Sequence, residues 1–133
     1  MAATGPGGAA APPRALRAPN IGAVLGRIEK TARVGVRDGG HDLAFEALGT
    51  YCRVSFGGAS SSVAAVRNAV LQWVAAFEAR YSRFLPDSLI SQINQSAGKG
   101  WVALDGETEK ILALCDQMVF FTRGVFDPTA LPL

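Results

Sequence analysis

A long stretch of apolar residues at helical spacing limits the possible folds of this chain more than any other feature. Large apolar side chains recur every three or four positions between residues 63 and 81: Val63, Val66, Val70, Trp73, Val74, Phe77 and Tyr81. This spacing predicts an α-helix with one apolar face. Such a face must pack against a partner surface, so we expect Trp73 and Phe77 to be among the most buried residues.

Shorter elements are predicted on both sides of this helix. Residues 43–48 and 51–56 read as two strands, and the Gly49 between them suggests a bulge or a close backbone approach. Asp87 or Ser88 can cap a short helix, residues 101–104 read as a short strand, and Asp105 can cap a final helix. The fold class is therefore α+β, with a few strands and two main helices. These strands supply too little surface for both helix faces, which suggests a truncated fold.

The N-terminal part of the chain differs in composition from the rest. Its first 19 residues are almost all Ala, Gly and Pro, and cannot bury enough surface to offset the entropy of ordering them. Residues 20–34 have apolar residues at helical spacing, weakened by two glycines, and Gly39-Gly40 marks a break. We therefore expect a disordered or weakly ordered leader at 1–41 and the folded domain at 42–133. Deleting residues 1–19 should then leave stability nearly unchanged.

Charge is unevenly distributed along the chain. Residues 1–41 carry six Lys/Arg and two Asp/Glu (+4), whereas residues 42–133 carry seven and nine (−2). A nucleic-acid-binding domain needs basic residues clustered on a folded face. Here the excess positive charge lies in the leader, so a nucleic-acid partner is not expected.

Targeting and metal-binding signatures are also missing from the sequence. It has no secretory signal pattern, no lipid-anchor cysteine and no apolar run of transmembrane length, which favours the cytoplasm. His41 is the only histidine, and no CxxC, HExxH, Walker-type or GxGxxG motif occurs. Cys52 and Cys115 fall on apolar faces and are expected to be buried free thiols, with a lone disulfide as the alternative.

Three segments remain as candidates for chemistry, each with a purely structural alternative. Ala47-Leu48-Gly49-Thr50 can be a bulged strand. In the segment 81–94, YSRFLPDSLISQIN, the aromatic residues can pack in the core or stack on a flat ligand ring. In the segment 124–129, GVFDPT, Asp127-Pro128 can be an ordinary helix start, or the turn can present main-chain amides and a carboxylate to a nucleotide.

Taken together and in this order, these segments resemble the FAD:protein FMN transferases, formerly described as thiamine-biosynthesis lipoproteins. The resemblance runs from Phe45 to Leu133. It rests on ALGT, YSRFLPDSLISQIN, WVALDGETEKIL and TRGVFDPTALPL, four motifs in order. Members bind FAD and, with Mg²⁺, transfer its FMN part to a Thr or Ser hydroxyl of a target flavoprotein, releasing AMP.

The resemblance also implies which residues contact FAD. Leu48 matches a hydrophobic position, often Met, that packs on the flavin nucleotide, and Phe84 matches an aromatic at the same site. Val125, Phe126 and Asp127 match a turn that contacts FAD. This chain departs from the pattern in having Leu for Met at 48 and Phe for Tyr at 84; the second change loses a hydroxyl but keeps a ring for stacking.

The catalytic and Mg²⁺-binding residues of the family are expected downstream of Leu133. The resemblance therefore covers the N-terminal part of the fold only and assigns no metal ligand within this chain. Phosphoryl transfer depends on positioning and on charge neutralisation by metal. We accordingly expect residues 1–133 alone to transfer no FMN and to bind FAD weakly or not at all.

Two other interpretations stay open. The chain can be a non-catalytic remnant that keeps nucleotide or protein binding, or an unrelated small α+β interaction module. The four ordered motifs argue against the unrelated module, and the coding sequence after Leu133 would separate an enzyme from a remnant. The sequence identifies neither the target flavoprotein nor any chain that would complete the site.

Overall fold

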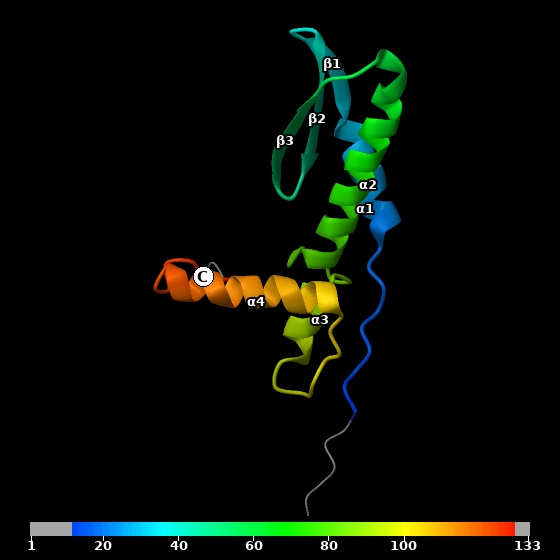
Figure 1. The fold of residues 1–133 in the computed structure, drawn as a ribbon. Helices are drawn as coiled ribbons and strands as arrows, with labels where there is room; N and C mark the ends of the chain where they lie inside the picture. The colour runs from blue at the N-terminus through cyan, green and yellow to red at the C-terminus, as the bar shows by residue number, and fades with distance from the viewer. Residues whose placement is uncertain (1–11, 130–133) are drawn as a thin grey trace, which may run out of the picture. The chain divides into compact units, whose positions relative to one another are not determined.

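A computed structural model describes residues 12–129 of the chain (Figure 1). In chain order these residues form α1 (Ile21–Thr31), β1 (Arg33–Arg37), β2 (Gly40–Ala47), β3 (Thr50–Phe56), the 3-10 helix η1 (Ser60–Ser62), α2 (Val63–Tyr81), α3 (Leu89–Ser96) and α4 (Gly106–Phe121). The α+β class expected from the sequence is confirmed.

The chain divides into two compact units. Of the described residues, the larger unit contains 15–100, and the smaller combines 12–14 with 101–129. The larger unit therefore contains all three strands and the helices α1, α2 and α3, whereas α4 belongs to the smaller.

The sheet of the larger unit is antiparallel with the order β1-β2-β3. Both connections are tight hairpins: Arg37 pairs with Gly40, and Ala47 pairs with Thr50. Side chains alternate along β2, so Leu43, Phe45 and Ala47 point into the core. The predicted bulge at residues 48–49 is thus a two-residue turn between two paired strands.

The core begins earlier in the chain than the sequence suggested. Residues 21–37 were assigned to a weakly ordered leader, but they form α1 and β1. Val24 and Ile28 of α1 are buried in one cluster with Phe45 of β2 and Leu71 of α2. Figure 1 shows α1 and α2 side by side next to the sheet. The two glycines of α1 misled the prediction because tertiary packing outweighs their low helix propensity. Residues 1–11 of the expected leader lie outside the described residues.

The predicted helix over residues 63–81 is confirmed, and Val74 of its predicted apolar face is buried, but the expectation that Trp73 and Phe77 are among the most buried residues is wrong. The buried residues of α2 are Leu71, Val74, Ala75, Glu78 and Ala79. Trp73 is 69% exposed and Phe77 36% exposed. The sheet and α1 pack on the face with the smaller side chains, because small residues let these elements approach closely. The large aromatic side chains lie on the neighbouring face, where Trp73 and Phe77 stack with their ring centroids 5.9 Å apart.

The N-terminal caps of α3 and α4 were predicted correctly from the sequence. The Ser88 side chain accepts a hydrogen bond from the Ser91 amide at the start of α3, and Asp105 accepts one from the Thr108 amide at the start of α4. In place of the short strand expected at 101–104, Val102 forms a single parallel bridge with Arg14.

Candidate functional site

The larger unit contains a pocket of about 490 Å³ at the C-terminal end of α2. Its walls come from α1, from the β2–β3 turn, from the last turns of α2 and from the loop that follows α2. The lining residues are Arg27, Leu48, Gly49, Phe77, Glu78, Tyr81, Ser82, Arg83, Phe84 and Leu85. A volume of this size, with apolar walls and a few polar groups, is typical of small-molecule sites. Leu48 and Phe84, expected from two separate motifs to contact one ligand, thus line the same pocket.

Leu48 reaches the pocket through an unusual backbone conformation. Leu48 has a φ of 55° and Gly49 a φ of 72°. Two successive positive φ values are the pattern of a type I′ hairpin turn, which favours Asn or Asp followed by Gly. The β1–β2 turn of the same sheet uses Asp38-Gly39 in this way. A leucine in the same conformation costs roughly 1–2 kcal/mol, and strain of this kind concentrates at functional sites.

Phe84 offers an exposed aromatic ring on the loop after α2. Phe84 is 79% exposed, so most of its side chain is open to a stacking ligand. The Arg83 guanidinium lies over it, with its central carbon 4.7 Å from the ring centroid. The loop is held in place because the Ser91 hydroxyl of α3 donates a hydrogen bond to the Arg83 carbonyl, 3.1 Å away. The site therefore combines a ring for stacking with a nearby positive charge.

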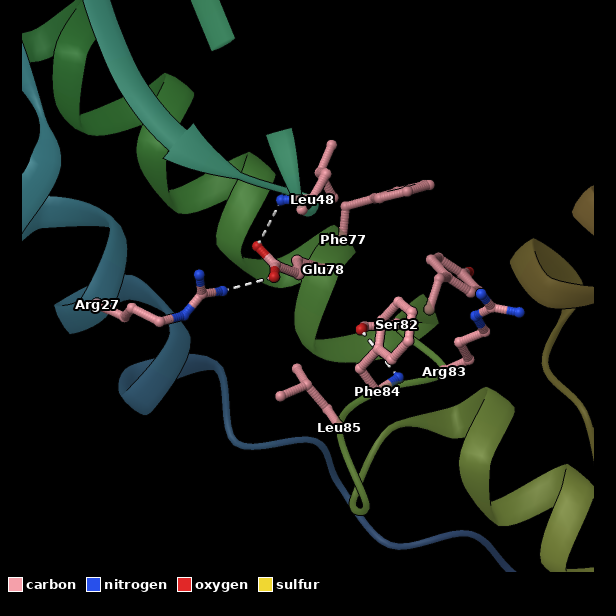
Figure 2. Close-up of a pocket in the computed structure, with 10 residues that line it drawn as sticks. Arg27, Leu48, Phe77, Glu78, Ser82, Arg83, Phe84 and Leu85 are labelled. Carbon is pink, nitrogen blue, oxygen red and sulfur yellow. Dashed lines mark hydrogen bonds and ion pairs between the residues drawn. The ribbon is translucent and has the colours of Figure 1, made fainter. Parts of the chain in front are cut away.

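A buried carboxylate joins three walls of the pocket. The Glu78 side chain is only 8% exposed. Its Oε1 accepts a hydrogen bond from Arg27 Nη2 at 2.5 Å, and its Oε2 accepts one from the Leu48 amide at 3.0 Å. Figure 2 shows the Glu78 carboxylate between the Arg27 guanidinium and the Leu48 backbone nitrogen. A buried charge is costly unless it is paired and hydrogen-bonded, and here both oxygens have partners.

The charge of the pocket lining is positive overall. The lining includes two arginines, Arg27 and Arg83, and one carboxylate, that of Glu78. The Arg27 side chain is half exposed, and Arg27 also lines a second, smaller pocket beside Glu46 and Tyr51. An anionic ligand with a flat ring suits this combination of aromatic wall and positive charge.

The third predicted contact segment lies in the smaller unit and is described by itself. After α4 the chain turns at Gly124, whose φ of 82° is left-handed. The Phe126 amide donates to Thr122 Oγ1 at 2.9 Å. Asp127 Oδ1 accepts hydrogen bonds from the Thr129 amide and hydroxyl at 2.8 and 2.7 Å. Val125 is fully exposed, so this turn presents an apolar side chain beside a carboxylate.

Two features are absent from the described residues. Among residues 12–129, no three His, Cys, Asp or Glu side chains are grouped so that they could hold a metal ion. No helix in this part of the chain is long and apolar enough to cross a membrane. Cys52 and Cys115 are free thiols, as expected, but both are partly rather than fully buried.

Sequence reasoning missed Arg27 and Glu78 as parts of the site. Glu78 lies on the same face of α2 as the buried residues Leu71, Val74 and Ala75. A charged residue among buried apolar ones indicates a special role, but the sequence did not show which face of α2 is buried. Arg27 gave no such signal, because it lies 51 positions from its partner in a segment expected to be weakly ordered. Phe77 was expected in the core but lines the pocket instead.

Comparison with known proteins identifies the family of this chain. The match covers the part of the chain that contains the motifs. Residues 48–133, which are more than half of the chain, match the profile of the ApbE family. No curated protein and no solved structure matches the chain. The match begins at the pocket residue Leu48 and includes Phe84 and the turn at 124–129. The chain belongs to the ApbE family, which is the FAD:protein FMN transferase family.

Proposed function

We propose that this chain acts in the Mg²⁺-dependent transfer of FMN from FAD to a Thr or Ser hydroxyl of a target flavoprotein. In this reaction the hydroxyl oxygen attacks the phosphorus of the FMN half. A new phosphoester bond forms, the bond between the two phosphates breaks, AMP leaves and the hydroxyl proton is released. Family membership supports the reaction class, and the target protein is a partner of this chain in the proposal.

One observation carries the proposal at the level of residues: Leu48 and Phe84, from separate motifs, line one pocket of suitable size and charge. We assign Leu48 to packing on the flavin nucleotide and Phe84 to stacking on its ring system. Val125, Phe126 and Asp127 are assigned to FAD through the motif match alone. Mg²⁺ would neutralise charge on the phosphates during transfer. The described residues offer no ligand set for it, so no residue of this chain is given that role.

The proposal is tested by incubating the purified protein with FAD, Mg²⁺ and a Thr-bearing acceptor peptide. Both residues 1–133 and the complete product of the coding sequence that contains them are assayed. Covalent flavin on the acceptor, detected as a mass increase of one FMN unit, is the expected result for the complete product. The prediction that residues 1–133 alone transfer no FMN is decided by the same assay. FAD binding without transfer by either protein would favour the non-catalytic alternative.

Binding variants test the residue assignments. Phe84→Ala should weaken FAD binding about tenfold or more, because base-on-aromatic stacking contributes roughly 1–3 kcal/mol. Asp127→Ala should lower FMN transfer by weakening the positioning of FAD. Trp101→Ala is the matched control, since Trp101 is also 79% exposed but lines no part of this pocket. Equal FAD affinity for Phe84→Ala and wild type, measured by flavin fluorescence titration, would contradict the assignment.

A further inference from the structure

We propose that Glu78 is a positioning residue that holds two walls of the flavin pocket, the Leu48 turn and the Arg27 guanidinium, in the geometry that binds the ligand. The inference deepens the proposed function and rests on it for the identity of the ligand. Glu78 belongs to none of the motifs that suggested the site, and it is assigned no contact with FAD. Its role is indirect, through the residues that it holds.

The hydrogen bond to the turn is the first part of the argument. The strained turn exposes the Leu48 amide, which has no strand partner at the tip of a hairpin. Glu78 Oε2 accepts that amide at 3.0 Å across the interior of the unit. Asn and Asp, the usual residues at this turn position, can stabilise the turn with a local side-chain hydrogen bond. Leu48 has no such group, and the bond from its amide to Glu78 stabilises the turn instead. It ties the one residue with an unfavourable backbone conformation at the pocket to the rigid helix α2.

The ion pair with α1 is the second part. Arg27 is half exposed, and one of its terminal nitrogens is bound to Glu78 Oε1. A guanidinium carries five N–H donors in a planar fork, so fixing one edge of the fork orients the others at the pocket where Arg27 lies. Arg27 is outside the residues that match the family, whereas Glu78 and Leu48 are inside them. Glu78 thus joins a segment outside the matched region to the site.

The directions of the two Glu78 hydrogen bonds distinguish a positioning role from simple core packing. A residue that only fills space would stabilise α2 without favouring any one amide. Here each carboxylate oxygen is directed at a different pocket wall, and the bonds leave the helix in two directions (Figure 2). Loss of the carboxylate should therefore loosen the Leu48 turn more than the rest of the unit.

The test compares Glu78→Ala, Glu78→Gln and wild type, with Glu29→Gln on α1 as the control carboxylate, which lies on the surface. Amide hydrogen exchange is followed by NMR at Leu48, with Ala75 of α2 as an internal reference in the core. We expect exchange at Leu48 to accelerate about tenfold in Glu78→Ala relative to Ala75, the equivalent of losing one hydrogen bond. Glu78→Gln keeps an acceptor oxygen, so its exchange rate at Leu48 should lie between those of wild type and Glu78→Ala. The exchange rate in Glu29→Gln should equal that of wild type.

FAD is the probe in the second measurement. Its dissociation constant should rise about five- to tenfold in Glu78→Ala, less in Glu78→Gln and less than twofold in Glu29→Gln. Unchanged exchange at Leu48, or equal acceleration at Leu48 and Ala75, overturns the positioning role. If Glu78→Ala does not fold, the Glu78→Gln variant alone tests the positioning role, because Gln has nearly the same side-chain volume as Glu. If wild-type protein binds no FAD, the proposed function fails, and the exchange measurement still decides the role of Glu78.

Discussion

At the scale of single residues, Leu48 illustrates a conflict between stability and the proposed function. Its backbone adopts a conformation that suits Asn, Asp or Gly, with a φ of 55°, while its side chain is half exposed at the pocket. The core gains little from such a side chain. An apolar group held at a strained turn beside a pocket is better explained by contact with a ligand than by folding.

Leu48→Asn should therefore raise the stability of the protein and weaken FAD binding. Asn tolerates a positive φ, so the free energy of unfolding should increase by about 0.5–1 kcal/mol in urea denaturation. FAD affinity should fall because the apolar wall is lost. Asp38→Asn in the other hairpin is the control, since both residues tolerate the conformation and the position is outside this pocket. A less stable Leu48→Asn protein would contradict the strain argument.

At the scale of elements, one face of α2 packs in the core and the neighbouring face lines the candidate pocket. One face carries Leu71, Val74, Ala75 and Ala79 into the core. The next face carries Trp73 and Phe77, and Tyr81 continues the row with its ring centroid 4.9 Å from that of Phe77. This aromatic row ends at the pocket, which both Phe77 and Tyr81 line. The helix thus supports the core and builds a wall of the site.

Alanine substitutions on the two faces should have very different costs. Leu71 is fully buried, so Leu71→Ala should lower the free energy of unfolding by about 2–5 kcal/mol. Trp73→Ala removes a largely exposed ring and one stacking contact, and should cost about 1 kcal/mol or less. Thermal or urea unfolding of residues 1–133 measures both. A larger loss of unfolding free energy for Trp73→Ala than for Leu71→Ala would instead support the sequence-based prediction that Trp73 lies on the buried face.

At the scale of the whole molecule, the segment before α1 is tied to the folded chain. The Arg17 amide donates to Gln92 Oε1 at 2.8 Å, and Gln92 Nε2 donates to the Arg17 carbonyl at 3.0 Å. Gln92 is a buried residue of α3 and also donates to the Asp87 carbonyl. In the smaller unit, the Arg14 amide donates to the Trp101 carbonyl at 2.9 Å. The described part of the expected leader therefore makes backbone contacts in both units.

Deleting residues 1–19 should consequently destabilise the protein, in contrast to the expectation from composition. The deletion leaves the buried Gln92 amide without two of its partners, which costs about 1–3 kcal/mol. Gln92→Ala should have an effect of similar size. If the Arg17–Gln92 contact is the cause, combining the deletion with Gln92→Ala should cost less than the sum of the two. Additive losses in urea unfolding would assign the effect to other contacts.

Local signals in the sequence were sufficient to predict much of the fold and part of the site. Strands β2 and β3, the helix over 63–81 and the caps at Ser88 and Asp105 all depend on interactions between near neighbours in the chain. Such interactions are readable from spacing and residue type. The same holds for the four motifs, whose order indicated the family that the comparison then identified.

By itself, then, the sequence determined the α+β class, most element types and the family, along with Leu48 and Phe84 as candidates. Only the tertiary structure decided which face of α2 is buried, that α1 and β1 belong to the core, and that Glu78 joins Arg27 to the Leu48 turn. The reason is physical. Burial and long-range hydrogen bonds depend on which distant segments approach one another, and the small residues of α2 allowed a closer approach than its large aromatic side chains.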